Sequence, residues 1–106
     1  MTSAAGQKRY TSFRDFYPFY LSEHSNRTNR LLHFVGTSVS FTLIIGAIVS
    51  GRPLLLLAAL AVGYAFAWVG HFKFEKNRPA TFKYPLYSLA ADWVMWKDIL
   101  TRRIRF

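Results

Sequence analysis

The sequence predicts an all-α integral membrane protein: an antiparallel transmembrane helical hairpin with amphipathic interfacial helices on its cytoplasmic side. Two uncharged stretches of 20 residues each, 31–50 and 53–72, are separated only by Gly51 and Arg52. At a rise of about 1.5 Å per residue, each stretch is about 30 Å long, which is the thickness of a bilayer's hydrocarbon core. So short a loop allows only an antiparallel hairpin.

The composition predicts a single membrane domain over residues 1–106. Apolar residues make up 52% of the chain and aromatic residues 18%, while the formal net charge is +9. A chain of this length has too little protein to bury two such apolar helices in a soluble core. The absence of cysteine excludes disulfides, thiolate metal sites and cysteine nucleophiles. The small number of acidic residues argues against a catalytic cluster of carboxylates; they are Asp15, Glu23, Glu75, Asp92 and Asp98.

The segments before the hairpin are predicted from polar and aromatic patterns. Residues 1–12 are small and polar and are expected to be a flexible N-terminus; no apolar segment follows them directly, as one would in a secretory signal. Residues 13–23 carry aromatic side chains near helical spacing, which predicts an amphipathic interfacial helix. The polar link 24–30 then offers Ser25 or Asn26 as the N-cap of the first membrane helix.

The segment 84–100 is predicted to be an interfacial helix or a short third membrane helix. It is apolar enough to contact lipid, but it contains Asp92 and is short for a perpendicular span. A third crossing would also carry the basic C-terminal residues to the side of the membrane that has few positive charges. We therefore favour the interfacial arrangement.

The basic residues predict that both termini are cytoplasmic. Of the 14 lysines and arginines, five precede the first stretch, eight follow the second, and only Arg52 lies in the turn. Positive charge is retained on the cytoplasmic side of a membrane. A bacterial inner membrane or the endoplasmic reticulum fits this topology, and the lipid bilayer is the expected partner. No nucleic-acid-binding module is recognisable, so no nucleic acid partner is expected.

The predicted topology brings all three histidines to one level of the membrane. His24 lies just before the first stretch, His33 in its first turn and His71 in the last turn of the second. Glu75 follows His71 by four residues and shares its helix face, and Asp92 could close the site. Such a set suits Fe(II), Mn(II) or Zn(II), and the lack of cysteine favours the harder ions.

The metal-site hypothesis depends on one geometric condition, and both the histidines and Asp92 also have a purely structural interpretation. His24 and His33 are nine residues apart, so they converge only if the link between them interrupts the helix. A histidine at a membrane interface is often an anchor or a hydrogen-bond partner, which leaves the structural and the metal-binding interpretations about equally open from spacing. A buried Asp92 could likewise pair with a nearby arginine or lysine.

The strings HSNRTNRLLHFVG and GHFKFEKNRPATFKYPLYSLAADWVMW resemble the membrane 2-hydroxy fatty acid dioxygenase family. The first contains His-x4-Asn-x3-His-x2-Gly and the second Gly-His-x3-Glu-x-Asn-x-Pro-Ala, and the resemblance covers about residues 13–100. It implies an Fe(II)-dependent dioxygenase of fatty acid α-oxidation that shortens long-chain 2-hydroxy fatty acids by one carbon. The residues that match its site are the iron ligands His24, His33 and His71, with Glu75 and Asn29 beside them.

The expected chemistry suits a membrane interface. A long-chain 2-hydroxy acid would keep its tail in lipid, while its carboxylate and hydroxyl chelate the metal and leave a position for dioxygen. Asp92 completes the expected catalytic set with Glu75 and Asn29. Three basic residues are candidates for binding the substrate carboxylate, and these are Arg30, Lys73 and Arg78. A homodimer is a further expected partner, because a second chain could supply additional ligands.

A different class of function stays open from the sequence. The basic, aromatic interface also suits a non-catalytic membrane hairpin that binds anionic lipid or a protein partner. Such a protein would bind lipid in a salt-dependent manner and would be insensitive to chelators.

Overall fold

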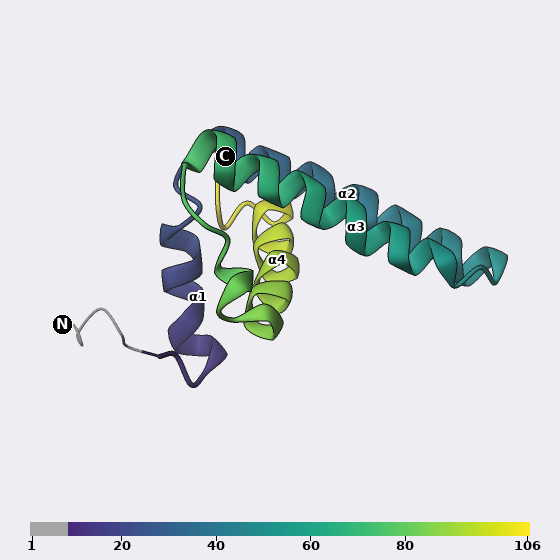
Figure 1. Ribbon diagram of the computed structural model, residues 1–106. Coiled ribbons are helices and arrows are strands. Elements are labelled where there is room, and N and C mark those ends of the chain that lie inside the picture. The colour runs from purple at the N-terminus through teal and green to yellow at the C-terminus, as the bar shows by residue number, and fades with distance from the viewer. Residues whose placement is uncertain (1–8) are drawn as a thin grey trace.

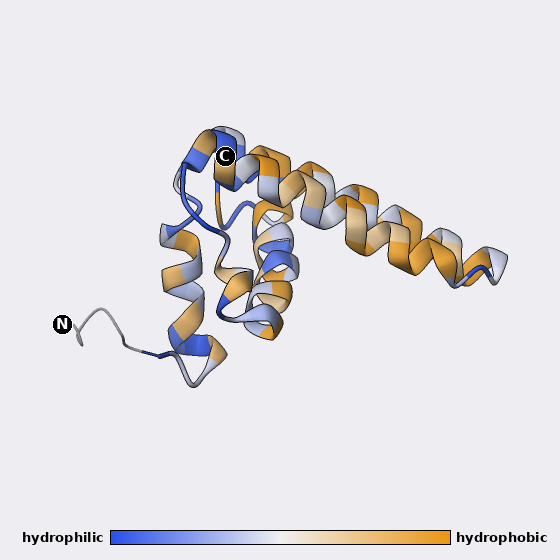
Figure 2. Cartoon of the chain, in the orientation of Figure 1, coloured by the Kyte–Doolittle hydropathy of each residue, from blue (hydrophilic) through white to orange (hydrophobic). Residues whose placement is uncertain are grey.

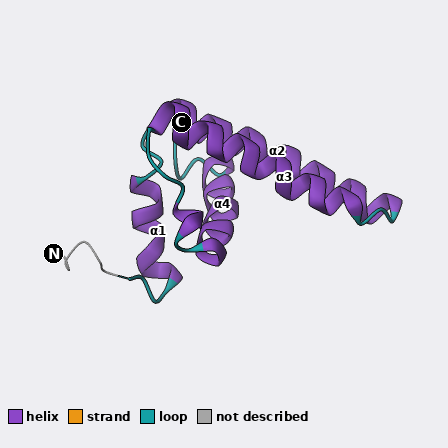
Figure 3. Ribbon diagram, viewed as in Figure 1, coloured by secondary structure: helices purple, strands orange, loops and turns teal. Residues whose placement is uncertain are grey.

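Every regular element of the chain, as far as the structure describes it, is a helix (Figure 3). The structure is a computed structural model that describes residues 9–106, so most of the expected flexible N-terminus, residues 1–8 of 1–12, lies outside the described residues. The predicted all-helical class is confirmed. The elements in chain order are α1 (Phe13–Ser22), α2 (Arg27–Ser50), α3 (Leu54–Val69), the π-helical turn η2 (Gly70–Glu75), the short 3-10 helix η3 (Ala80–Phe82) and α4 (Pro85–Leu100).

The α2–α3 pair forms a long arm, in which the two helices lie side by side and are joined by a short turn (Figure 1). α2 begins before the uncharged stretch because the Asn26 side chain caps it, accepting a hydrogen bond from the Asn29 amide at 3.1 Å. At this same end of the pair, away from the turn, η2 extends α3 to Glu75. Two helical segments, Arg27–Ser50 and Leu54–Glu75, are long and apolar enough to cross a membrane.

The arm leaves much of its apolar surface uncovered by the described chain. Figure 2 shows hydrophobic residues along most of its length and hydrophilic residues gathered at the end near α1. Near the turn, Ile48 is 72% exposed, Val49 81% and Leu54 76%. A water-soluble monomer rarely exposes so continuous an apolar surface. We therefore expect lipid or another protein to cover the apolar surface of the arm.

The packed core lies at the opposite end of the arm, where α1 and α4 meet (Figure 1). Phe16 and Tyr20 of α1 pack with Ala91, Met95 and Ile99 of α4, and all five side chains are buried. Large aromatic and aliphatic side chains in mutual contact supply most of the stabilisation available to so small a core. This core holds α1 and α4 together beside the start of α2.

α4 is joined to α2 by its tryptophans. The Trp96 indole N–H donates a hydrogen bond to the Ser38 hydroxyl at 2.9 Å, and the rings of Trp93 and Trp96 pack against Phe41. In Figure 1, α4 lies across the arm at the end that is away from the turn. One face of α4 therefore packs against α2.

The close approach of α2 and α3 gives a test of the arm's packing. A Cβ placed on Gly36 would lie 2.6 Å from the Cβ of Phe66, whereas one on Gly46 would meet only Leu55 Cδ1 at 3.7 Å. We expect Gly36→Ala to lower the free energy of unfolding by about 1–3 kcal/mol, since rigid atoms must move apart. The matched variant Gly46→Ala should be neutral or gain up to about 1 kcal/mol of helix propensity. Denaturant titrations in micelles measure both, and equal stabilities of the two variants would contradict the packing.

Candidate metal centre

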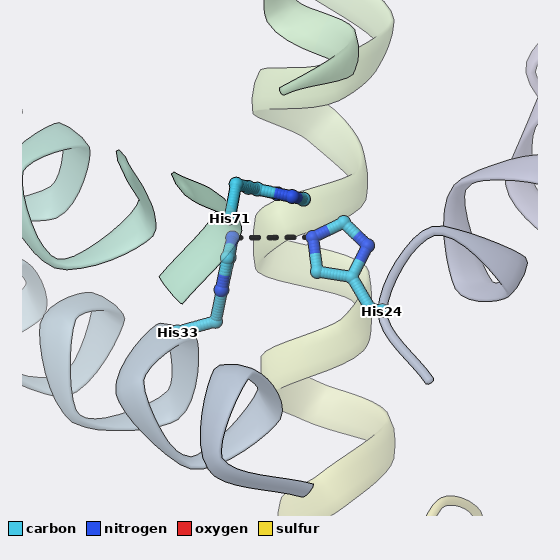
Figure 4. A group of neighbouring side chains, drawn as sticks. All are labelled: His24, His33 and His71. Carbon is cyan, nitrogen blue, oxygen red and sulfur yellow. Dashed lines mark hydrogen bonds between the residues drawn. The ribbon is translucent and has the colours of Figure 1, made fainter. Parts of the chain in front are cut away.

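Three histidines from three different segments meet in one buried space (Figure 4). His24 lies in the link between α1 and α2, His33 in α2, and His71 in η2. Their candidate ligand nitrogens all lie within 4.8 Å of one another, and the three side chains are only 1%, 4% and 2% exposed. The helix is interrupted between Ser22 and Arg27, as the convergence of His24 and His33 requires.

Hydrogen bonds determine which nitrogen of each ring carries the proton. In every case Nδ1 lies within hydrogen-bond distance of an oxygen that can only accept, so Nδ1–H must be the donor. Each Nε2 is therefore left with its lone pair directed at the other two rings. The three bonds run from His24 to the Tyr20 carbonyl at 2.6 Å, from His33 to the Asn29 carbonyl at 3.0 Å, and from His71 to Asn77 Oδ1 at 2.6 Å.

Asn77 has its amide orientation set by a second hydrogen bond. Its Nδ2 donates to the Glu23 carbonyl at 3.1 Å, which turns Oδ1 toward His71 Nδ1. Sequence reasoning assigned Asn77 no role, although it is the asparagine of the pattern Gly-His-x3-Glu-x-Asn. Its place in that pattern was the available signal. A partner of this kind orients a metal-binding imidazole and raises its basicity.

The distance between two of the ring nitrogens tests whether a metal ion fits. His24 Nε2 and His33 Nε2 are 3.1 Å apart (dashed in Figure 4), and both carry lone pairs when the rings are neutral. A proton between them would require a charged ring, but burial, together with His33 and His71, holds the pKa of His24 well below its usual value. Two nitrogens bound at right angles, each about 2.1 Å from one ion, would be about 3.0 Å apart. His24 and His33 are therefore close enough to bind one divalent metal ion, and His71, whose ligand nitrogen lies within 4.8 Å of theirs, completes the set with a small inward shift of its ring.

Three protein ligands would leave at least one coordination position of such an ion open. Three neutral imidazoles occupy three positions, and a catalytic site keeps at least one more for water or substrate. Nitrogen ligands without thiolate suit iron, zinc or manganese and do not select one of them.

Hydrogen bonds of Glu75 and Asn29 hold together the segments that carry the histidines. The Glu75 carboxylate accepts hydrogen bonds from the Asn26 amide, the Asn29 Nδ2 and the Ser25 hydroxyl, each at 2.9 Å. These bonds tie the end of η2 to the start of α2. Glu75 and Asn29 therefore help to position the three rings by holding together the backbone segments that carry them. The candidate metal ligands themselves are the three histidines.

η2 depends on a glycine where it passes α2. A Cβ on Gly70 would overlap the Asn29 side-chain oxygen, so no other residue allows this approach without a shift. A π-helical turn inserts an extra residue per turn, and such turns recur at functional sites. Here the π-helical turn carries His71, the residue after Gly70.

Asp92 and Tyr20 form part of the wall of the site. The Tyr20 hydroxyl donates a hydrogen bond to Asp92 Oδ1, and the Tyr20 ring stacks on the His24 ring with centroids 4.0 Å apart. Burial raises the pKa of Asp92 to about 7, with the Tyr20 hydrogen bond acting in the opposite direction. Burial and Asp92 both raise the pKa of Tyr20 well above its usual value, so Tyr20 remains a donor. The partner of Asp92 is thus a phenol and not the basic residue of the salt-bridge interpretation.

A small chamber of about 20 Å³ opens against the three histidines. Tyr20, Asp92 and Ser88 also line it. The Ser88 hydroxyl is buried and has no hydrogen-bond partner among the described residues. The chamber is about large enough for one water molecule. It therefore offers a position beside the rings where a small polar reactant can bind.

The three basic residues expected to bind a carboxylate differ in their surroundings. None of them lines the chamber within the described chain. Lys73 and Arg78 are exposed and lie over the rings of Phe74 and Phe82. Arg30 is half-buried, its Nε has no partner among residues 9–106, and its charge contributes to the low pKa of His24. Of the three, only Arg30 is partly buried and has a charge that acts on His24.

Residues 10–104 match the family model described as 2-hydroxy-palmitic acid dioxygenase Mpo1-like. The chain belongs to the Mpo1-like family. The family resemblance seen in the sequence is thus confirmed, and the matched residues contain every histidine, Asn77, Tyr20 and Asp92. No curated protein and no solved structure matches the chain. The Mpo1-like description names a 2-hydroxy fatty acid dioxygenase, and the geometry shows a buried group able to hold a metal ion.

The role of Asn77 can be tested by metal binding. Asn77→Ala leaves His71 Nδ1 without its acceptor, and we expect the affinity for Mn(II) or Co(II) to fall about 10–100-fold. Asn77→Asp keeps an acceptor oxygen at the same position and should retain most of the affinity. Titration calorimetry in detergent measures both dissociation constants, and unchanged binding by Asn77→Ala would contradict the assignment.

Proposed function

We propose that the protein is an Fe(II)-dependent dioxygenase of fatty acid α-oxidation, which shortens long-chain 2-hydroxy fatty acids by one carbon at the membrane interface. The observation that carries the proposal is the set of three Nε2 lone pairs directed into one buried space in a member of the Mpo1-like family. His24, His33 and His71 would hold the ion.

The proposal places the α2–α3 arm in a bilayer. The outward face of the arm is apolar and exposed, and a hydrocarbon environment is the partner that matches its length. The excess of basic residues outside the arm's turn supports cytoplasmic termini, in a bacterial inner membrane or the endoplasmic reticulum. α1 and α4 would then lie at the cytoplasmic interface, with the histidines at the same level. A homodimer stays a prediction.

Bound Fe(II) would supply the binding and reduction of dioxygen beside the substrate. Arg30 would bind the substrate carboxylate, because its Nε is buried without a partner among the described residues and its charge acts on His24. Asp92 Oδ1 accepts the Tyr20 hydrogen bond, so Oδ2 would accept the proton of the 2-hydroxyl group. The surrounding apolar side chains would exclude water from the reacting carbons.

The overall reaction balances with dioxygen as the oxidant. One 2-hydroxy acid and one dioxygen would give the acid shortened by one carbon, one carbon dioxide and one water. The C1–C2 bond breaks, C1 leaves as carbon dioxide, and C2 becomes the new carboxyl carbon.

The non-catalytic hairpin remains the second candidate. The net charge of +9 and the aromatic interface favour binding of anionic lipid or a protein partner. This candidate gives no reason for three neutral imidazoles to present lone pairs to one another, an arrangement that is repulsive without a cation. We therefore rank the dioxygenase first.

Turnover tests the proposed function directly. We expect 2-hydroxypalmitate labelled with ¹³C at C1 to yield ¹³C-labelled carbon dioxide and pentadecanoate, and His33→Ala or His71→Ala to abolish both products and the bound iron. Mass spectrometry measures the products. Leu57→Ala, at a 64% exposed position on α3, serves as the control that should retain activity. Turnover that persists in either histidine variant would contradict the ligand assignment.

A further inference from the structure

A second and much larger cavity, of about 210 Å³, runs along the arm from the histidines. It lies between α2, α3 and α4. Its lining begins with His33 and Asp92 and reaches Ile44 on α2 and Leu56 on α3. His33, Asp92, Tyr64 and Ala67 line both this cavity and the small chamber, so the two spaces meet at the metal site.

The polarity of the cavity changes along its length. The end near the metal site carries His33, Asp92 and the Tyr64 ring, whereas the far end is lined by Ile44, Leu56 and Leu60. The Ser40 hydroxyl in between donates to the Ala59 carbonyl at 2.7 Å, so it is already paired. An amphiphile with a polar head and an aliphatic tail matches a cavity that is polar at one end and apolar at the other.

The length of the cavity sets the length of that tail. His33 and Ile44 are eleven residues apart on α2, and Ala67 and Leu56 are eleven apart on α3. At about 1.5 Å per residue the cavity extends about 16 Å. An extended alkyl chain advances about 1.25 Å per carbon, given C–C bonds of about 1.5 Å and angles near 111°. The cavity therefore accommodates about 13 carbons beyond the head group.

We propose that this cavity is the acyl-chain channel of the protein, and that Ile44 and Leu56 at its far end set the upper limit of substrate chain length. The inference rests on the proposed function. The competing occupant is the tail of a bulk membrane phospholipid. Continuity with the histidine chamber favours the substrate, because a free acid bound here has its carboxyl end at the metal site while its tail points toward the membrane interior.

Photolabelling tests the channel without turnover. Metal-free protein in phosphatidylcholine nanodiscs is exposed, in the absence of dioxygen, to 2-hydroxy acids carrying a diazirine at carbon 5 or carbon 14. From the rise per residue and per carbon, we expect the carbon-5 probe to label around Thr37 and Tyr64 and the carbon-14 probe to label Ile44 and Leu56. A phosphatidylcholine with the same diazirine chain is the control and should label outward positions such as Val49 and Leu57. Labelling by the free acid that matches the phospholipid pattern would overturn the proposal.

Substitutions along α3 test which residues limit chain length. Leu60 lies four residues, or about 6 Å, closer to the histidines than Leu56. The length limit is the number of carbons in the longest acid that displaces the probe. Leu60→Trp should therefore give a length limit about five carbons shorter than Leu56→Trp gives. Leu57→Trp, on the same helix but outside the cavity lining, should leave the length limit unchanged. An unchanged limit in Leu60→Trp would overturn the proposal.

The two proposals fail in distinguishable ways. Position-specific labelling with no turnover in the iron-loaded protein would support the channel and contradict the dioxygenase. Turnover of 2-hydroxy acids with labelling confined to outward positions would support the dioxygenase and overturn the channel.

Discussion

The arrangement of this molecule depends on three imidazoles that are each oriented by a hydrogen bond from Nδ1. Because the acceptors are two backbone carbonyls and the Asn77 side chain, every Nε2 is left unprotonated and directed at its neighbours. Three lone pairs in one buried space are unfavourable without a cation. The interruption after α1, the π-helical turn η2 and the Glu75 hydrogen bonds all serve to bring these rings together.

The rest of the chain supplies two different environments to this centre. On one side, the α1–α4 core holds Tyr20 and Asp92 against the rings and keeps bulk water away. On the other, the α2–α3 arm extends an apolar channel away from the rings. A polar reacting group and a long alkyl chain can therefore be held at once, which a metal site in a purely polar surface would not allow.

The sequence predicted the helical class and the convergence of the histidines because both follow from hydropathy and connectivity. Uncharged stretches of sufficient length predict a hairpin, and a hairpin returns His71 to the level of His24 and His33. Asn77 and Tyr20 were missed because their roles depend on side-chain direction, which periodicity does not reveal. For the same reason the sequence could not distinguish Arg30 from Lys73 and Arg78, although in the structure only the Arg30 side chain has a buried nitrogen without a partner among the described residues.

The central claim is that the three histidines bind one iron ion, and the most direct measurement is made on protein purified without dioxygen or chelator. Elemental analysis should give close to one iron per chain, and the iron K-edge X-ray absorption spectrum should show three imidazole nitrogens in the coordination shell. A well-folded sample that takes up no iron from added Fe(II), or whose iron spectrum lacks imidazole scattering, would contradict the account.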